Sequence, residues 1–227
     1  MDNTIDIFIQ YMIELLPLLL KGLKITIWVS SIAFILSVFL GAILAIVQFF
    51  KVKVLSILVK IYISYFRGTP LLIQLFIFYY GFPMIFDFMK TFPKTEALIL
   101  CLALNSSAYI AEIIRGSIES VDKGQYEACL AFGMSKTKMM TRIILPQAAV
   151  SSIPPIVNSA LDIIKMSSLG MTIGIQDIMG EAQLAAAVSY KMLETYIVAA
   201  AFYWIISVIL SKVQKMFEIK VGLAYRR

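Results

Sequence analysis

Two ionisable side chains lie in largely apolar stretches of this chain, where an unpaired charge is costly to bury. Arg67 stands in the stretch FRGTPLLIQ, and Asp162 stands in SALDIIK. A guanidinium pairs bidentately with a carboxylate, and a carboxylate accepts hydrogen bonds from an ammonium group. We therefore predict that the two side chains hold opposite ends of a small zwitterion. Two structural alternatives stay open: an Arg67 that pairs with an acid of the protein, and an Asp162 in an outward-facing loop.

Hydroxyl and amide groups stand near these charges. Thr69 lies two residues after Arg67, and Asn105 and Tyr109 share one face of a predicted helix because they are four residues apart. We predict that these three side chains add hydrogen bonds to the same site. Polar contacts between helices are the structural alternative for Asn105 and Tyr109.

The composition places these residues in a membrane protein. The chain has 227 residues, of which 60% are hydrophobic and 15% charged, and its mean hydropathy is +0.88. A soluble domain needs more polar surface than this. Uncharged runs such as 25–50 exceed the roughly 20 residues needed to cross a bilayer. We predict an all-α membrane protein with five transmembrane helices, near 25–47, 54–80, 97–114, from about 146, and 193–213.

Glycine and proline predict breaks inside this helical pattern. The second span is interrupted at 67–70 by Gly68 and Pro70. The fourth contains Pro154-Pro155 and is not expected to be one straight helix. The apolar, glycine-containing stretch 165–174 predicts a broken element that lines a cavity or packs inside protein.

Lysine and arginine residues predict the orientation. With the N-terminus outside, the inner segments hold twelve of them and the outer segments six, so the positive-inside rule favours N-terminus out and C-terminus in. The chain then divides into an outer, partly amphipathic segment 1–24, a transmembrane domain 25–217 and an inner tail 218–227. The net charge of +6 mostly follows from this asymmetry and requires no nucleic acid partner.

Missing residue types exclude several kinds of chemistry. The chain has no histidine, and its two cysteines, Cys101 and Cys129, do not have metal-ligand spacing. A serine–histidine or cysteine–histidine pair is therefore impossible, and no zinc site is predicted. No glycine opens a Gly-x-x-x-x-Gly-Lys-Ser/Thr phosphate loop. We predict a protein that is not an enzyme and that binds no cofactor or ATP itself.

The stretch 112–146 is polar and charged and lies between two apolar runs, so we expect it to face water. Good helix formers occupy 125–132, and Gly133 can end a helix in the left-handed conformation. Apolar side chains at the end of a short stiff helix fit a groove on a partner protein; an ordinary solvated loop is the alternative. The residues expected to form the docking surface are Gln125, Glu127, Ala128, Phe132, Gly133 and Met134.

Four sequence elements together resemble the permease subunits of polar amino acid ABC importers. They are FRGTPLLIQ at 66–74, AYIAEIIRG at 108–116, the stretch with Glu127-Ala128, Gly133 and Leu145-Pro146, and PPIVN at 154–158. They stand in the family's order and cover most of residues 60–180. The resemblance implies the five-helix, MetI-like core of type I importers, in which 112–146 contains the EAA loop that couples to an ATPase.

The resemblance also implies partners and a location. Such a permease works in the bacterial cytoplasmic membrane with a second permease subunit, as a homodimer or heterodimer. It works with two copies of an ATP-binding subunit and with an extracytoplasmic substrate-binding protein. The implied function is ATP-driven import of a polar amino acid by alternating access. An ion-coupled secondary amino acid transporter is the alternative, although such folds usually show internal repeats and more spans.

One element departs from the family pattern. Where the family has a sequence like LKDTSL, this chain has IKMSSL at 164–169, with Met166 in place of Asp and Ser167 in place of Thr. Ser167 and Ser168 are kept as candidates for the substrate site, but the departure weakens the transfer of substrate details. The stretch DIMGEA at 177–182 is similar to permeases for cystine and related sulfur compounds, while arginine, lysine, histidine, glutamine and glutamate stay open.

Overall fold

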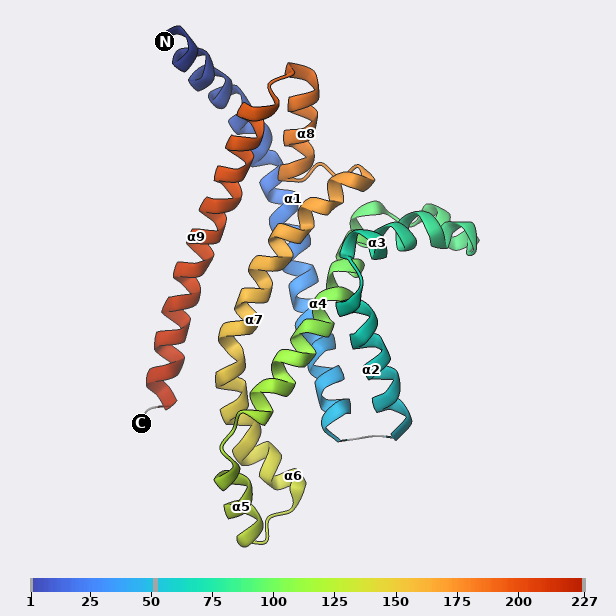
Figure 1. Ribbon diagram of the computed structural model, residues 1–227, viewed down its shortest axis with the longest axis vertical. Helices are drawn as coiled ribbons and strands as arrows, with labels where there is room; N and C mark the ends of the chain where they lie inside the picture. Colours follow the sequence, from blue (N-terminus) through green and yellow to red (C-terminus); the bar gives the residue numbers. More distant parts are fainter. Residues whose placement is uncertain (1, 51–52, 226–227) are drawn as a thin grey trace.

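The structure, a computed structural model, describes residues 2–50 and 53–225, with side chains described for 8–50 and 53–216. Its longest helix, α1 (Asp2–Phe49), runs along most of the molecule (Figure 1). At 1.5 Å per residue a helix of 48 residues extends about 72 Å, far beyond the ~30 Å of a membrane core. The predicted segment 1–24 and the first predicted span are therefore one helix, with no break near residue 24.

The second predicted span changes direction at its glycine and proline. The helix α2 (Lys53–Gly68) and the helical stretch Leu71–Met84 meet at an angle of 107°. Pro70 is extended, with ψ of 137°, and α3 (Leu71–Phe76) begins directly after it. The predicted interruption at 67–70 is confirmed, and α3 with the short turns after it projects to the side of the molecule (Figure 1).

The remaining elements complete a helical bundle with a small arm at one end. The helix α9 continues to Tyr225, so the predicted tail from residue 218 is not set off by a break; residues 226–227 lie outside the described part of the chain. The elements are η1 (Ile77–Gly81), η2 (Phe82–Met84), η3 (Asp87–Thr91), α4 (Lys94–Glu119), α5 (Lys123–Ala131), α6 (Lys136–Met139), η4 (Met140–Ile144), α7 (Leu145–Ser167), η5 (Ser168–Ile173), α8 (Ile178–Ser189) and α9 (Met192–Tyr225).

Three helical stretches of the described chain are long and apolar enough to cross a membrane: Phe8–Phe49, Lys94–Glu119 and Met192–Met216. The bent pair around Pro70 makes a fourth if it counts as one span. The predicted count of five is therefore not reached by length and composition. The helix expected as the fourth span, α7, packs along α1, α4 and α9 but is not among these three stretches. It contains serines, two consecutive prolines and the charged residues Asp162 and Lys165.

The paired prolines do not interrupt α7. Because of Pro154 and Pro155 we expected the fourth span not to be one straight helix. The helix runs without a break from Leu145 to Ser167, and its departure from a straight axis stays a prediction. Hydrogen bonds from both sides surround the pair, since Ser159 Oγ donates to the Pro155 carbonyl (3.2 Å) and Gln214 Nε2 on α9 donates to the Pro154 carbonyl (3.4 Å). The second of these bonds links α7 to α9 beside the prolines. The carbonyls that the two prolines leave without a helical donor are those of Val150 and Ser151, four residues earlier.

The main core forms where α1, α3, α4 and the end of α7 meet. The predicted broken element at 165–174 closes this core: α7 ends at Ser167, η5 follows, and Gly174 has a left-handed backbone with φ of 77°. The fully buried side chains that α1, α3, α4 and α7 contribute include Val29, Ala33, Leu75, Leu98, Leu102 and Ile163. This core fixes the two helices, α4 and α7, that carry most of the polar cavity described below.

A glycine allows α8 to approach α1. A β-carbon at Gly22 would lie 2.6 Å from the main-chain carbonyl carbon of Asp177, which is backbone and cannot rotate away. Overpacking costs about 1–3 kcal/mol, and each kcal/mol shifts the melting temperature of a chain of this size by about 2–4 °C. We therefore expect Gly22→Ala to lower the melting temperature in detergent by about 2–12 °C. Gly116→Ala on α4, where the added carbon meets open space, is the matched control. Equal melting temperatures for the two variants would contradict this role of Gly22.

Candidate functional site

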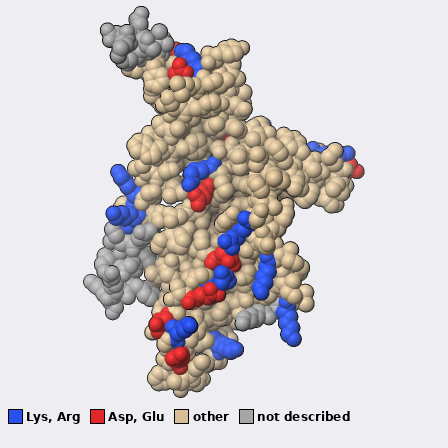
Figure 2. All heavy atoms as spheres, viewed as in Figure 1, with Lys and Arg blue, Asp and Glu red and all other residues tan. Residues whose placement is uncertain are grey.

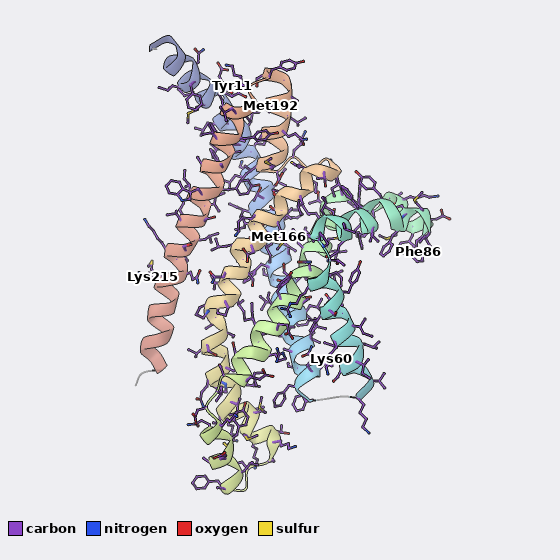
Figure 3. The ribbon with its side chains drawn as sticks, in the orientation of Figure 1. Tyr11, Lys60, Phe86, Met166, Met192 and Lys215 are labelled. Atoms are coloured by element: carbon purple, nitrogen blue, oxygen red, sulfur yellow. The ribbon has the colours of Figure 1, made fainter. Side chains whose placement is uncertain are left out.

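A cavity of about 820 Å³ opens between the end of α2, α4 and α7. Four of the seven predicted substrate-site residues line it: Arg67, Asn105, Tyr109 and Asp162. Residues from three separate parts of the sequence thus meet in one place. Figure 3 labels a further lining residue, Met166, near the middle of the molecule on α7. The other lining residues are Ser106, Glu112, Ile113, Pro155, Asn158, Ser159 and Lys165.

Arg67 reaches the cavity from the last turn of α2 and pairs with an acid of the protein. Its Nη1 lies 3.1 Å from Oε2 of Glu112 on α4. Its guanidinium carbon lies 5.6 Å from the centre of the Tyr109 ring, which is within cation–π range. The side chain remains 43% exposed, so part of the guanidinium is open to a ligand. Arg67 therefore pairs with an acidic residue of the protein, as the structural alternative proposed, and it also keeps an exposed side that a ligand can reach.

Asp162 lies on α7 and also lines the cavity, in a helix instead of an outer loop. Its Oδ1 is 2.7 Å from Nζ of Lys165, one helical turn further on, and both side chains are more than half exposed. The positive and negative groups predicted to hold a zwitterion therefore each have a counter-ion within the chain. Exposed pairs of this kind contribute about 0–1 kcal/mol to stability, so an incoming charge can compete with them.

Asn105 and Gln74 hold together the bend at the end of α2. Nδ2 of buried Asn105 donates to the Phe66 carbonyl (3.0 Å) and to Oε1 of Gln74 (3.0 Å). Nε2 of Gln74 donates to the carbonyl (3.0 Å) and Oγ1 (2.8 Å) of Thr69. These bonds satisfy main-chain carbonyls freed by Gly68 and Pro70 and fix Arg67 between them. Asn105 thus lines the cavity, as predicted for a site residue, and also makes the polar contact between helices that was the structural alternative.

Three predicted substrate residues lie apart from the cavity lining. Oγ1 of Thr69 donates to the Tyr65 carbonyl, Oγ of fully buried Ser167 donates to the Ile164 carbonyl, and Oγ of Ser168 donates to the Lys165 carbonyl. Each hydroxyl therefore bonds to a main-chain carbonyl three or four residues earlier, which is a common state for serine and threonine in helices. Their hydroxyls are used locally and lie outside the cavity lining, and their contact with a substrate stays a prediction.

The network around Gln74 yields a stability prediction. Replacing Gln74 by Leu removes one of the two acceptors of the buried Asn105 amide and the donor to the Thr69 carbonyl, which costs about 1–3 kcal/mol. We expect Gln74→Leu to lower the melting temperature of the purified protein in detergent by several degrees, about 2–4 °C for each kcal/mol. The same substitution at exposed Gln183 on α8 is the control. An unchanged melting temperature for Gln74→Leu would show that the bend is stable without this network.

The arm from Asp122 to Ile144, here called the α5–α6 arm, extends from the end of the molecule opposite α8 (Figure 1). Asp122 caps α5 by accepting from Gly124 N at 2.7 Å, and Gly133 follows the helix with a left-handed φ of 65°. The short helix and its glycine end are therefore confirmed. Gln125, Glu127, Ala128 and Gly133 are exposed, Phe132 is 86% exposed, and Met134 packs partly against the apolar interior of the arm.

Comparison with known proteins decides the family. The family described as binding-protein-dependent transport system inner membrane component matches residues 37–222. The chain belongs to this family. A probable amino-acid ABC transporter permease protein, PatM, from Vibrio harveyi is 44% identical over 218 residues, with 96% of this chain and 98% of that protein covered. The L-cystine transport system permease protein TcyB from Bacillus subtilis is 41% identical over 203 residues, covering 89% and 86%.

A solved structure confirms the fold of this permease. In the crystal structure of an amino acid ABC transporter with histidines, one chain is 35% identical to it and superposes with a TM-score of 0.86. The match covers 92% of this permease and 96% of that chain. The predicted all-α, MetI-like core of an ABC permease is therefore confirmed. As a transport component, the permease is also consistent with the prediction that the chain is not an enzyme.

Sequence reasoning missed two charged residues of the permease cavity, Glu112 and Lys165. Glu112 was visible only as a letter of the AYIAEIIRG element, and Lys165 was counted among the outer basic residues. The available signal was spacing, because Glu112 lies three residues after Tyr109 and Lys165 three residues after Asp162. Each is therefore on the same helix face as a predicted site residue.

Proposed function

We propose that this permease is the membrane subunit of an ATP-driven importer that moves a polar amino acid across the cytoplasmic membrane by alternating access. The observation that carries the proposal is the cavity in which Arg67 and Asp162 stand on different helices with exposed charges. Arg67 would bind the α-carboxylate and Asp162 the α-ammonium. Asn105 and Tyr109 would add hydrogen bonds. Thr69, Ser167 and Ser168 would support the surrounding backbone.

The charge balance of the cavity favours an amino acid without net charge. The charged lining residues in the described part of the chain are Arg67 and Lys165 against Glu112 and Asp162, two of each sign. An uncharged or internally balanced substrate preserves this balance, whereas arginine or glutamate adds one unpaired charge. Ile113 and Met166 supply an apolar wall. Cystine or a related sulfur amino acid fits this description, and the likeness to the L-cystine permease supports that choice.

The α5–α6 arm is proposed to dock the ATPase. Its exposed surface carries Gln125, Glu127, Ala128, Phe132 and Gly133, with Met134 behind them. In the proposed assembly two ATP-binding subunits meet two permease subunits, as a homodimer or heterodimer, and an extracytoplasmic binding protein delivers the substrate. The N-terminus is placed outside and the C-terminus inside, so that the arm faces the cytoplasm. An ion-coupled transporter needs no ATPase, so it would not explain this exposed arm.

Transport by the reconstituted complex tests the proposal. The permease, with the ATPase and binding protein that co-purify with it from its native cells, is placed in liposomes, and uptake of radiolabelled L-cystine is measured. We expect uptake to require ATP on the side of the ATPase and to persist when ion gradients are collapsed. Excess unlabelled L-glutamine, L-arginine and L-glutamate then rank the competing amino acid classes. Uptake driven by an ion gradient without ATP would overturn the importer assignment.

A further inference from the structure

Acidic and basic side chains alternate along one face of the molecule (Figure 2). Four charged side chains form a connected series, here called the charge ladder, that starts at Arg67 in the cavity and continues along α4. Glu112, Arg115 and Glu119 lie three and four residues apart and therefore occupy one face of that helix. The members in order are Arg67, Glu112, Arg115 and Glu119.

Glu112 is shared between two guanidinium groups. Its Oε2 lies 3.1 Å from Nη1 of Arg67 and accepts from Nη2 of Arg115 at 3.0 Å, while its Oε1 accepts from Nε of Arg115 at 3.0 Å. The Glu112 side chain is 23% exposed, and its partners Arg67 and Arg115 are 43% and 41% exposed. Arg115 continues the ladder by donating from Nη1 to both carboxylate oxygens of Glu119 at 2.7 Å.

The lower end of the ladder reaches the α5–α6 arm. Arg115 and Glu119 line a second hollow of about 230 Å³ together with Tyr126 of α5. The Tyr126 hydroxyl donates to the Ile118 carbonyl at 3.0 Å, which ties α5 to the end of α4. Partial burial and then the negative charge of Glu119 raise the pKa of Tyr126. Tyr126 of the arm and Glu119 at the foot of the ladder therefore lie around the same hollow.

A substrate carboxylate and Glu112 compete for the same cation. In the empty cavity Glu112 neutralises Arg67, and a bound α-carboxylate offers Arg67 the same chemistry. When Arg67 turns to the substrate, Glu112 keeps its two hydrogen bonds to Arg115 and stays paired. The exchange therefore leaves no charge without a partner, which is the condition for a low barrier between the two arrangements. It gives two discrete states of one side chain, empty and occupied.

We propose that Glu112 is a positioning residue that holds Arg67 in the empty cavity, yields it to the substrate carboxylate, and transmits this change through Arg115 and Glu119 to the α5–α6 arm. The proposal rests on the proposed function, because it assumes that an amino acid enters the cavity. The proposal adds a route by which substrate in the cavity changes the rate of ATP hydrolysis by the ATPase. By linkage, changes that ATP drives in the ATPase should also change the affinity of the cavity through the ladder, and the state without ATP is the reference for both.

Two readouts on one set of variants test the proposal. The first is the Kd of radiolabelled L-cystine for the purified permease–ATPase complex in nanodiscs, without ATP and without binding protein, so that only the cavity is measured. The second is stimulation of ATP hydrolysis by the L-cystine-loaded binding protein in proteoliposomes. The variants are Glu112→Gln, which removes the competitor, Glu119→Gln, which breaks the ladder below Arg115, and Glu96→Gln, an exposed glutamate at the other end of α4.

Each variant has its own expected result. Glu112→Gln should bind L-cystine about fivefold more tightly, because a half-exposed ion pair no longer competes, and should lose most of the ATPase stimulation. Glu119→Gln does not touch Arg67, so its Kd should equal that of the wild type while the stimulation falls at least about threefold, the size of a modest coupling free energy. Glu96→Gln should change neither readout.

The outcomes separate the possible failures. A Glu112→Gln complex that assembles but binds L-cystine no more tightly than the wild type would overturn the proposal. If the Glu112→Gln variant does not assemble, the Glu119→Gln variant decides. With the Kd for L-cystine unchanged, full stimulation of ATP hydrolysis would overturn the proposal. With the same Kd, lost stimulation would support it. A wild-type complex that binds L-cystine but whose variants show none of these changes refutes the ladder alone. A wild-type complex that binds no amino acid refutes the proposed function instead.

Discussion

Replacing Arg67 by Ala should reduce amino acid uptake about a hundredfold while the permease still assembles with its ATPase. In the proposed site, the guanidinium is the only contact assigned to the substrate carboxylate. Removing one partner of such a charge pair costs about 2–5 kcal/mol, and each 1.4 kcal/mol is a factor of ten. The fold should survive, because Glu112 keeps Arg115 and the Asn105–Gln74 network bonds the backbone around residue 67 and not its side chain.

Uptake into proteoliposomes and co-purification of the ATPase measure the two parts of this prediction. Lys60→Ala is the matched control, since Lys60 is an exposed basic residue on the same helix, α2, away from the cavity lining (Figure 3). Arg67→Lys keeps the charge but not the planar fork and should fall between wild type and alanine. If Arg67→Ala fails to accumulate in the membrane, Arg67 is needed for folding, and its role as a substrate ligand loses its support.

The sequence predicted the residues of the cavity better than their partners. Arg67 and Asp162 were recognisable because each is a charge in an apolar stretch, and burial cost makes such positions informative from sequence alone. The Arg67–Glu112 pair was not recognisable, because 45 residues separate them and their contact depends on the direction that the chain takes at Pro70. Glycine and proline predicted that bend but not its angle of 107°.

The hydroxyl residues of the prediction lie outside the cavity lining. Thr69, Ser167 and Ser168 stood next to charged positions, and sequence proximity suggested a shared site. In helices such side chains can bond to their own backbone one turn earlier, as these three do. The structure shows these local bonds, and a substrate contact by the three hydroxyls stays a prediction. Asn105 does not bond to its own helix in this way, because its amide on α4 reaches across to the freed carbonyl of Phe66 on α2.

The span count shows a limit of hydropathy. Glycine, proline and uncharged runs predicted five spans, yet α7 does not qualify by length and composition. Ser159, Asp162 and Lys165 of α7 line the cavity, and Ser152 and Ser167 are buried inside the protein, so polar side chains of this helix have polar or protein surroundings. Helices that line a transport cavity are expected to be amphipathic, because polar groups at membrane depth are tolerated where they face protein or water.

Replacing Phe132 by Asp should abolish co-purification of the ATPase without destabilising the permease. The ring is 86% exposed directly after α5, so it contributes little to the core. An exposed aromatic side chain beside a glycine turn is the kind of anchor that dominates a protein interface, where its loss costs about 2–4 kcal/mol. The aspartate carboxylate would also have to lose its water where the ring docks on the ATPase, which adds a desolvation cost. The association of permease and ATPase should therefore weaken at least about a hundredfold.

A pull-down from mild detergent with each tagged variant measures this association. Tyr190→Asp is the matched control, because Tyr190 is also 86% exposed but lies after α8 at the opposite end of the molecule. Its backbone is left-handed, with φ of 60°, and aspartate tolerates that conformation. Phe132→Leu should retain most of the binding, since it keeps an apolar side chain. If Phe132→Asp and Tyr190→Asp retain the ATPase equally, the α5–α6 arm does not use Phe132 as its anchor, and the docking surface must centre on another residue.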